Sequence, residues 1–474
     1  MIKYRTEKDS IGSLGVPANA YYGVQTMRAL SNFPVSGEKN HPTLIRSYVL
    51  VKKACAMTNH ELGVLDKKRA NAIVRACDSI LSGLFADQFV IDKYQAGAGT
   101  SLNMNVNEVI ANIALESLGR PKGEYSSVNP NDHVNMSQST NDTFPTTAHI
   151  ALLLNIKPLI ASLQQLQAAF LKKAAVFRTL LKSGRTHLQD AVPVTLGQEF
   201  RAYAETVHKT ISMLKDVALP SHTPTLLEIP IGGTATGTGI NTPPGFRKVV
   251  IKHLRQLTGL DVFPSNDTRE GLQSRLAISH TSGILSSIAL ELIRIANDLR
   301  LLSSGPVTGL AEITLPAVQP GSSIMPGKAN PVMAEALDMI CFRVVGNGLT
   351  VSMAEQAGQL ELNVMMPVMA NTLLESIDLL KNFLPAFTHK AVEGITANKE
   401  RLHYYFSHTP ALATLLNTHI GYLNATEVVK QALKENKPVL DVIVEKGLLT
   451  KQQLKKLLEV NQITNNTRPF APTN

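Results

Sequence analysis

The sequence predicts a mainly α-helical fold of three domains, with a bundle of long helices in the centre, and three observations lead to it. The chain has 474 residues, which is too long for one ordinary domain of roughly 100–200 residues. Aromatic residues make up only 5% and tryptophan is absent, so aliphatic side chains must form the core, and these suit helix packing. Apolar residues in the middle of the chain recur at alternating spacings of three and four, which is typical of a helical bundle.

The first predicted domain, residues 1–142, mixes short helices with loops rich in glycine and asparagine. These residues favour turns and connections between regular elements. Two of the four loop segments that can carry chemistry lie in this domain.

The central domain, residues 143–394, is predicted from three runs of apolar residues at the bundle spacing. They occupy residues 152–170, residues 285–302 and the region that begins at Met333. Pro158 should kink the first of these helices or lie in its first turn.

The second run predicts one continuous helix from about residue 268 to residue 304, roughly 55 Å long at 1.5 Å per residue. Gly305-Pro306 follows it as a stop signal. Further apolar residues lie off the seam at Ile278, Ile284, Ile293 and Leu301. More than one face of the helix therefore needs cover, and we expect partner chains of a homo-oligomer to supply it.

The last predicted domain, residues 395–474, consists of small helices separated by asparagine, glycine and proline. Its lysines are scattered among leucines, which indicates the solvated faces of short helices. The polar end of the chain, from residue 461, is expected to be loosely packed.

Composition excludes several classes of protein. Hydrophobic residues make up 44% and charged residues 18%, so the chain is not mainly disordered. Cys55, Cys77 and Cys341 form no CxxC pair, which excludes a disulfide framework and a zinc ribbon. The charged N-terminus lacks the apolar core of a secretory signal, and no stretch approaches the ~20 uncharged apolar residues of a membrane span. We therefore expect a cytoplasmic protein that makes no membrane contact.

The net charge of +9 is compatible with two kinds of partner, nucleic acid or a small dicarboxylate. A nucleic-acid-binding helical oligomer would need a basic stripe with interleaved aromatic residues, or a known binding module. The sequence contains neither, so we expect a small dicarboxylate and no nucleic acid.

Four loop segments rich in glycine and small polar residues lie between apolar helices. The first, residues 97–101, combines two hydroxyl side chains with glycines that let backbone N–H groups approach a ligand. The second, residues 129–142, ends in Ser139, Thr140 and Asn141 just before a long helix, whose N-terminus suits a carboxylate. Each has a simpler interpretation as well, an ordinary turn for the first and helix capping for the second.

The third segment, residues 184–190, follows a helix and places one titratable base, His187, beside the hydroxyl of Thr186. A lone histidine is more often structural than catalytic. This segment is therefore a candidate only in the company of the others.

The fourth segment, residues 321–331, resembles a phosphate-binding P-loop but fails on two counts. Five residues rather than four separate its glycines, and Ala329 stands where a serine or threonine should bind magnesium. What remains is a glycine-bracketed loop with two serines, followed by Lys328 and Asn330, which can grip a carboxylate.

This fourth segment reads Gly-Ser-Ser-Ile-Met-Pro-Gly-Lys-Ala-Asn-Pro and fits the signature loop of the aspartase/fumarase superfamily, GSSxMPxKxNP, in full. The chain resembles that superfamily nearly from end to end, from Val16-Pro17 to the Gly-Ile-Thr-Ala-Asn-Lys-Glu run at residues 394–400. The resemblance implies a homotetramer whose central domains join in one helical core. It also implies active sites that are shared between subunits.

Within the superfamily, the chain is more similar to the aspartases than to the class II fumarases. Residues 122–125 and Asn129-Pro130-Asn131-Asp132-His133 are typical of aspartases, whereas residues 417–422 read like a fumarase. Val307 and Ala329 depart from both. The resemblance implies a lyase that reversibly deaminates L-aspartate to fumarate and ammonia through a C3 carbanion. The alternative is a class II fumarase, which interconverts L-malate and fumarate.

The resemblance also assigns roles to residues. Removal of the C3 proton leaves a doubly charged aci-carboxylate, which needs converging donors and a nearby base. The β-carboxylate is assigned to Thr100, Ser139, Thr140 and Ser323. The α-carboxylate is assigned to Thr186, Lys328 and Asn330, and the leaving amine to Asn141 and His187.

Two further roles concern proton transfer. Ser322 is expected to be the general base, the alternative being that both serines of the loop only cap a turn. Glu335 is expected to pair with His187 and raise its pKa, the alternative being a structural role. No cofactor is required for this chemistry, although aspartases are often activated by magnesium.

Overall fold

The structure, a computed structural model, describes residues 3–463 of the chain. The chain forms two compact units, each made of separate segments. Unit 1 comprises residues 1–161, 212–289 and 342–381, and unit 2 comprises residues 162–211, 290–341 and 382–474. The division into domains 1–142, 143–394 and 395–474 stays a prediction.

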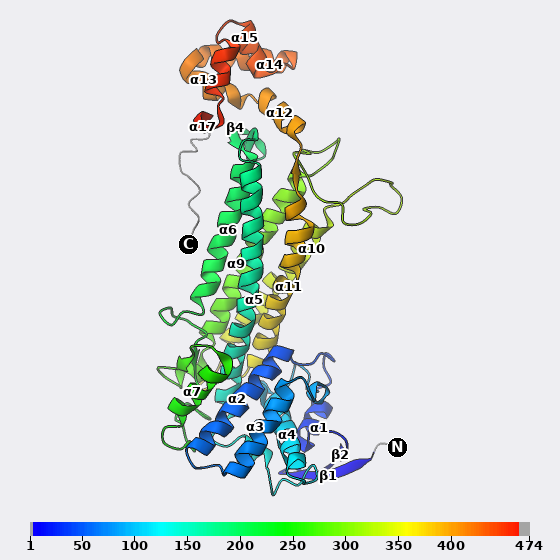
Figure 1. The fold of residues 1–474 in the computed structure, drawn as a ribbon, viewed down its shortest axis with the longest axis vertical. Coiled ribbons are helices and arrows are strands. Elements are labelled where there is room, and N and C mark those ends of the chain that lie inside the picture. The colour runs from blue at the N-terminus through cyan, green and yellow to red at the C-terminus, as the bar shows by residue number, and fades with distance from the viewer. Residues whose placement is uncertain (1–2, 464–474) are drawn as a thin grey trace. The chain divides into compact units, whose positions relative to one another are not determined.

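The N-terminal part of unit 1 is an antiparallel hairpin followed by packed helices. The elements are β1 (Tyr4–Asp9), β2 (Gly12–Pro17), α1 (Val24–Asn32), α2 (Pro42–Glu61), α3 (Lys67–Leu81), η1 (Ala86–Gln88), η2 (Gly97–Gly99) and α4 (Thr100–Ser117). Helices α2, α3 and α4 lie side by side (Figure 1). Because α2 and α4 have 20 and 18 residues, the expectation of only short helices in this region is wrong.

Helix α4 is hidden in the sequence because asparagines interrupt its apolar residues. Asn103, Asn105, Asn107 and Asn112 are all buried in it. The Nδ2 group of each donates a hydrogen bond within the unit, as when Asn105 Nδ2 donates to the Gln88 carbonyl over 3.0 Å. The polar residues therefore do not mark an exposed face.

The remaining elements confined to unit 1 surround the start of the long helix α5. They are the π-helical turn η3 (Pro130–Val134), the parallel strands β5 (Glu228–Ile229) and β6 (Phe263–Pro264), and the helices α7 (Phe246–Thr258) and α8 (Glu270–Gln273). Helix α7 packs against α2.

Five long helices have their residues divided between the units. They are α5 (Thr140–Val176), α6 (Leu196–Asp216), α9 (Leu276–Leu302), α10 (Val332–Gln356) and α11 (Met366–Lys390). Within unit 2, the ring of Phe170 in α5 lies 5.7 Å from that of Tyr203 in α6, whose hydroxyl donates to Asp298 of α9 over 3.2 Å. The predicted seams of α5 and α9 are confirmed, since their spaced residues from Leu152 to Phe170 and from Leu285 to Leu302 are all buried.

Two details of the long helices differ from expectation. The helix predicted over residues 268–304 is interrupted, because Ser274 has an extended backbone and separates α8 from α9. The N–H of Arg275 donates to Glu355 Oε1 over 3.0 Å instead of continuing α8. Helix α5, in contrast, continues through Pro158 as an inner residue.

Helices α5, α9 and α10 are long and apolar enough to cross a membrane, by length and composition alone. The expectation that no stretch approaches a membrane span is therefore wrong by this measure. The reason is that these helices are apolar on more than one face. Inside the described chain, 72% of the apolar window of α5 is buried, against 44% for α9 and 39% for α10. Both α9 and α10 thus leave apolar surface uncovered.

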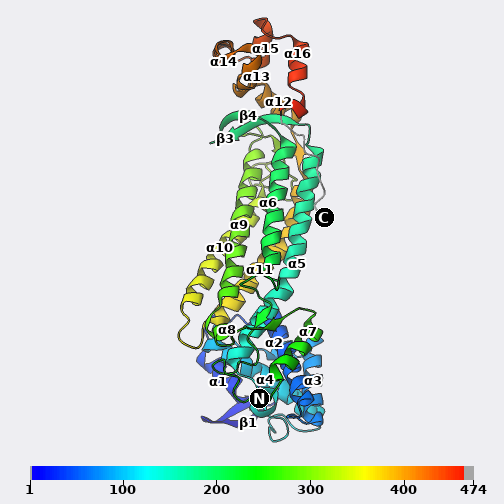
Figure 2. The same cartoon turned by 90° about the vertical axis from the view of Figure 1, so that its left-hand side faces the viewer.

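Unit 2 also contains a long hairpin and a group of small helices. The elements are β3 (Leu181–Thr186), β4 (Gln189–Thr195), β7 (Ile313–Thr314), η4 (Val392–Gly394), β8 (Thr396–Ala397), α12 (Lys399–His408), α13 (Ala411–Ile420), α14 (Tyr422–Glu435), α15 (Val439–Glu445), α16 (Lys451–Leu457) and α17 (Val460–Ile463). Figure 2 shows the β3–β4 hairpin beside α12 and α13. The small helices share a core that includes Leu412, Leu416 and Val442. Of the polar end, residues 464–474 lie outside the described residues.

Candidate active site

Two hydroxyl side chains lie at the start of α5. Ser139 directly precedes the helix, and Asp142 accepts the Ser139 backbone N–H at its Oδ1 over 3.0 Å. The Ser139 Oγ in turn accepts the N–H of Asn141 over 3.2 Å. Ser139 is therefore the N-cap of α5, with Asp142 bonded back to it, which explains why the helix begins here. The capping interpretation is therefore correct for Ser139, and it also places the hydroxyl at the positive end of the helix dipole.

Ser139 and Thr140, the two hydroxyl residues at the start of α5, line a pocket together with Thr100. The pocket has a volume of about 650 Å³, and its wall includes Thr100, Ser139 and Thr140. Asn141 lies at its edge, where its Nδ2 donates to the Ala235 carbonyl over 2.7 Å. All four residues predicted in unit 1 are thus brought together.

A glycine- and threonine-rich loop, residues 230–241, forms another part of the wall and was missed in the sequence. Thr234, Ala235 and Asn241 line the pocket. The N–H groups of Gly232 and Thr234 each donate to Asp142 Oδ2 over 2.9 Å. Its sequence signal is the same as that of the other four loops, because glycines and small polar residues lie between apolar ones in all five.

A buried lysine lies beneath the pocket. Lys52 of α2 is fully buried, and its Nζ donates to Asn135 Oδ1 over 2.8 Å and to Gln138 Oε1 over 2.9 Å. Both acceptors line the pocket. Burial lowers the pKa of Lys52 to about 7 and raises the pKa of Asp142 to about 6. The pocket wall is therefore anchored from below by two buried ionisable groups. The sequence did not reveal Lys52, because a lysine in a helix of mixed composition ordinarily lies at the surface.

The Asn129-Pro130-Asn131-Asp132-His133 segment forms the capped turn η3. Asn129 Oδ1 accepts the N–H groups of Asn131 and Asp132 over 2.8 and 3.1 Å. His133 Nδ1 accepts the Asn129 N–H over 2.8 Å, and burial lowers the pKa of His133. The first and last residues of the segment therefore hold the turn, while Asn131 and Asp132 line the pocket.

The glycines before Thr100 allow a close approach of two helices. Ala98 and Gly99 both have left-handed backbone, with φ of 61° and 83°. A Cβ on Gly99 would lie 2.1 Å from the ring of Phe144 in α5. The first loop is thus more than an ordinary turn, because it brings Thr100 against the start of α5.

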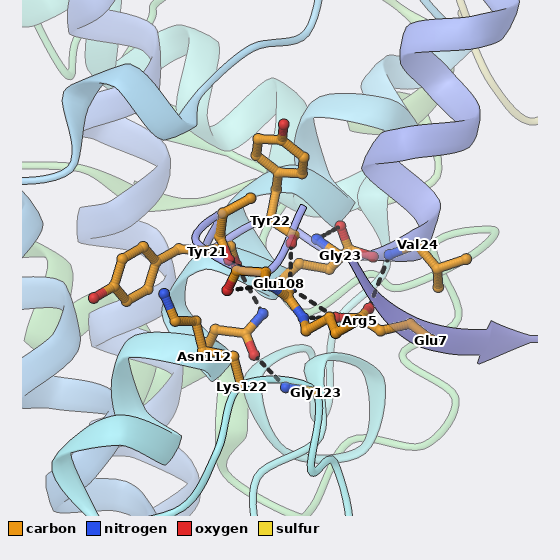
Figure 3. A network of polar contacts seen from close by, with 12 residues as sticks. Arg5, Glu7, Tyr21, Tyr22, Gly23, Val24, Glu108, Asn112, Lys122 and Gly123 are labelled. Atoms are coloured by element: carbon orange, nitrogen blue, oxygen red, sulfur yellow. Dashed lines mark hydrogen bonds and ion pairs between the residues drawn. The ribbon is translucent and has the colours of Figure 1, made fainter. Parts of the chain in front are cut away.

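Glu108 of α4 holds the start of α1, and Figure 3 shows it beside Gly23, whose N–H it accepts. Its buried carboxylate accepts the N–H groups of Gly23 and Gln25, each over 2.8 Å, and the hydroxyl of Thr26 over 2.6 Å. Gln25 lines the pocket beside Thr100. Burial raises the pKa of Glu108 to about 7, against the effect of these donors.

In unit 2, the third segment is the tip of the β3–β4 hairpin. Thr186 and His187 are exposed there, and the turn residues His187 and Leu188 have φ of 55° and 59°. Two-residue hairpin turns of this kind prefer Asn-Gly, because both positions are left-handed. Histidine and leucine at these two positions therefore strain the backbone locally, and strain of this kind is often found at functional sites.

The fourth segment is an exposed loop that is closed by its own hydrogen bonds. Gly321 N–H donates to the Lys328 carbonyl over 2.8 Å, and Asn330 Nδ2 donates to the Gly321 carbonyl over 2.7 Å. A Cβ on Gly321 would lie 2.5 Å from the Lys328 oxygen, so only glycine fits. Ser323 and Lys328 are exposed.

The hydroxyl of Ser322 occupies a distinct position in this loop. Its Oγ accepts two backbone N–H groups, from Ile324 over 3.2 Å and from Met325 over 3.0 Å. The serine therefore does cap a turn, as the simpler interpretation stated. The same two donors would also stabilise negative charge on the oxygen.

Glu335 lies in the first turn of α10. Between the described residues of unit 2 in a single subunit, no ion pair joins it to His187, and that pairing stays a prediction. The assigned roles of the other site residues stay predictions as well.

Two family patterns match the sequence. The family described as "Lyase" matches residues 12–346, and the one described as "Fumarase C C-terminus" matches residues 412–465.

Individual proteins match over nearly the whole length. The aspartate ammonia-lyase of Escherichia coli (strain K12) is 46% identical over 462 residues, which is 97% of this chain and 96% of that protein. The aspartate ammonia-lyase of Pseudomonas fluorescens is 48% identical over 458 residues, 96% of this chain and 95% of that protein.

Two solved structures are similar as well. A fumarate lyase:delta crystallin from Brucella melitensis bound to cobalt has a TM-score of 0.93 at 46% identity, covering 98% of this chain and 100% of that chain. A recombinant class II fumarase from Schistosoma mansoni has a TM-score of 0.92 at 35% identity, with the same coverage.

Proposed function

This chain belongs to the lyase family, and on that premise we propose that it is an aspartate ammonia-lyase, which converts L-aspartate reversibly to fumarate and ammonia. The observation that carries the proposal is the pocket in which Thr100, Ser139 and Thr140 meet at the positive end of α5. Converging hydroxyl groups at a helix N-terminus suit a carboxylate. The likeness to proteins named aspartate ammonia-lyase supports L-aspartate as the molecule that carries this carboxylate.

The three hydroxyl groups would bind the substrate β-carboxylate. When the C3 proton leaves, this carboxylate becomes a doubly charged aci-carboxylate, and fixed donors stabilise it more than they stabilise the ground state. Ser323 would add a fourth donor when the loop of residues 321–331 meets the substrate. The buried anchors Lys52 and Asp142 support this step, since they hold the wall before substrate arrives.

Ser322 would remove the C3 proton. A serine hydroxyl is far too weak an acid to ionise in water, so the alkoxide must be stabilised by its surroundings. The N–H groups of Ile324 and Met325, already within 3.2 Å of Oγ, provide two such donors. Lys328 in the same loop carries a positive charge that adds to the effect.

The other assigned residues would hold the far end of the substrate. Lys328, Asn330 and Thr186 would bind the α-carboxylate, through one ionic contact and two hydrogen bonds. Asn141 and His187 would bind the amine that leaves from C2, and Glu335 would orient His187. Elimination of this amine gives fumarate and ammonia.

The chemistry needs no organic cofactor, because the protein supplies the base and the donors. Magnesium activation is expected from the family. Among the residues described, no group of three or more histidine, cysteine, aspartate or glutamate side chains is placed to hold a metal ion.

A homotetramer that shares its active sites between subunits is part of the proposal. It is supported by exposed apolar residues on one face of α10: Met339, Phe342, Leu349 and Met353 are 55–66% exposed. Apolar faces of this kind mark interfaces rather than solvated surface. Copies of the same chain would cover them.

A cytoplasmic location is also part of the proposal, since Cys55, Cys77 and Cys341 are free thiols.

A second candidate, a class II fumarase, is favoured by the fumarase-like residues 417–422 and by the TM-score of 0.92 to the Schistosoma enzyme. The test is to follow fumarate release from L-aspartate and from L-malate with the same preparation. Aspartate should be the better substrate by at least ten-fold in kcat/KM, about 1.4 kcal/mol. A ten-fold preference for malate would make the enzyme a fumarase.

A further inference from the structure

A buried carboxylate in unit 1 joins two segments that line the pocket. Asp142, the third residue of α5, is fully buried. Its Oδ1 accepts the N–H of Ser139, which precedes the helix, over 3.0 Å. Its Oδ2 accepts the N–H groups of Gly232 and Thr234, each over 2.9 Å. The two oxygens therefore hold different segments, the start of α5 and the loop of residues 230–241.

The loop of residues 230–241 has a strained backbone at the point where Asp142 holds it. Thr234 has a left-handed φ of 56°, which is a rare conformation for a β-branched residue. Its Oγ1 is buried and has no hydrogen-bond partner among the residues that the structure describes. A strained conformation persists only where the surroundings fix it. Since this hydroxyl makes no such bond, the bond from the Thr234 N–H to Asp142 must supply part of the constraint.

The residue after Thr234 contacts one of the assigned site residues. The carbonyl of Ala235 accepts a hydrogen bond from the Nδ2 of Asn141 over 2.7 Å. A carbonyl oxygen can only accept hydrogen bonds, so it selects the NH2 group of the amide rather than its oxygen. The Oδ1 of Asn141, on the other side of the amide, is thereby turned away from Ala235.

The orientation of this amide decides which substituent it can bind. The ammonium group of L-aspartate has three N–H donors and no acceptor, like that of a lysine side chain. The Asn141 oxygen can accept from it, whereas a reversed amide would place donors against donors. The Ala235 carbonyl therefore fixes the orientation that suits the amine to which Asn141 is assigned.

We propose that Asp142 is a positioning residue for the lyase reaction: it anchors the loop of residues 230–241, whose Ala235 carbonyl turns the Asn141 amide oxygen toward the amine of the substrate. The proposal rests on the proposed function for the identity of that amine. All the groups in this series of contacts belong to unit 1 of a single subunit. The anchoring of the loop can therefore be measured without substrate.

Two variants at position 142 separate the loop from the start of the helix. The side chain of Asp142→Asn has one oxygen, which keeps two of the three N–H bonds if it faces the loop and loses only that of Ser139. Asp142→Ala keeps none of them. Asp142→Asn is thus the matched control, in which the helix cap is weakened and the loop stays anchored.

Kinetics in the amination direction give the first readout, because ammonia and fumarate then have separate KM values. Asp142→Ala should raise KM for ammonia about ten-fold or more, and Asp142→Asn less than about three-fold. KM for fumarate should change by similar factors in both, since both lose the bond to Ser139. KM does not depend on how much of the preparation is folded, so a loss of stability alone would not produce this pattern. Equal increases in KM for ammonia in the two variants, or none in Asp142→Ala, would overturn the proposal.

Asn141→Asp tests the link between Ala235 and the amide in a chain that keeps Asp142. A carboxylate cannot donate to the Ala235 carbonyl, so the two oxygens should repel each other and the side chain should turn away. KM for ammonia should then rise about ten-fold or more. If only an oxygen near the amine mattered, the negative charge would attract ammonium and lower KM. An unchanged or lower KM would therefore contradict the proposal.

Hydrogen–deuterium exchange of the native enzyme and the two variants at position 142 tests the anchor without substrate. Amides of residues 235–241 should exchange about ten-fold faster or more in Asp142→Ala than in the native enzyme and in Asp142→Asn. Equal exchange in all three would refute the anchoring role even if KM for ammonia rose. A native enzyme that is inactive on L-aspartate would refute the proposed function instead, and this measurement would still decide whether Asp142 anchors the loop.

Discussion

In unit 1, the residues that line the pocket are held from behind by buried groups, whereas in unit 2 the loop of residues 321–331 is exposed and closed mainly by its own hydrogen bonds. Lys52, Asp142 and Glu108 fix the pocket wall through bonds to amides and backbone N–H groups. The loop has no such buried anchor inside it. The comparison teaches that the hydroxyl groups assigned to the β-carboxylate in unit 1 are preorganised, whereas the loop assigned to proton removal has to be completed when substrate arrives.

The strongest test of this contrast is Ser322→Ala. If the loop supplies the base, this variant should lower kcat by at least ~10³, about 4 kcal/mol, while leaving the oligomer intact. Ser323→Ala, next to it in the same loop, should be milder and should act partly through KM. Steady-state kinetics and size-exclusion chromatography measure both. A Ser322→Ala enzyme that keeps a tenth of native kcat would refute the assignment and leave His187 as the next candidate base.

The second test compares two glycines with the same backbone in the two regions. Gly99, with φ of 83°, faces the Phe144 ring, whereas Gly327, with φ of 80°, has open space around it. Alanine at 327 should cost about 1 kcal/mol of backbone strain. Alanine at 99 should cost roughly 2–3 kcal/mol more, because the added carbon overlaps a buried ring. Thermal unfolding of both variants gives the answer, and equal Tm losses would show that the pocket is no more tightly built than the loop.

The third test asks whether the exposed loop binds substrate at all. Lys328 is exposed, and its assigned partner is the α-carboxylate. Lys328→Ala should raise KM at least ten-fold, which is about 1.4 kcal/mol, and should affect KM as strongly as kcat. Lys390→Ala, at the end of α11, serves as a lysine control outside the site. A near-native KM in Lys328→Ala would mean that the lysine points elsewhere.

The last test concerns the anchor Glu108, whose effect is spread over several pH units. Its pKa is raised from an ordinary 4.5 to about 7 by burial, so its contribution to stability is fully present below pH 4.5 and is lost as the pH rises through 7. Native stability should therefore fall relative to that of Glu108→Gln between pH 5 and pH 8, by at most about 1.4 kcal/mol per pH unit. Thermal unfolding across this range measures the difference. A constant difference in Tm would show that the N–H and O–H groups bonded to Glu108 keep its carboxylate ionised throughout.

The sequence predicted the long helices well and the buried polar parts poorly. The spacing of apolar residues located the seams of α5 and α9, because burial of one face requires that spacing. The break at Ser274 could not be seen, since a residue 80 positions away captures the N–H that would have continued the helix. Asparagines such as Asn105 in α4 look solvated in sequence, and only the fold supplies their buried partners.

The site residues divide in the same way, into those with a local sequence signal and those whose partners are distant in the sequence. Hydroxyl residues near Ser139 were found because they precede a helix, which is a local signal. Lys52 was not found, since a lysine in a helix of mixed composition ordinarily lies at the surface, and its partners Asn135 and Gln138 are more than 80 positions away. The loop of residues 230–241 carried the same signal as the four segments that were chosen, so it could have been predicted.

The left-handed turn at His187 and Leu188 has a consequence for protein engineering. Asparagine and glycine would relieve its backbone strain, so a selection for heat resistance alone should replace these two residues with Asn-Gly. The variants recovered would be more thermostable and, if His187 binds the amine, inactive. Thermostability and turnover therefore compete at one two-residue turn. A directed-evolution campaign that screens both properties at once should leave His187 and Leu188 unchanged while it stabilises the rest of the protein.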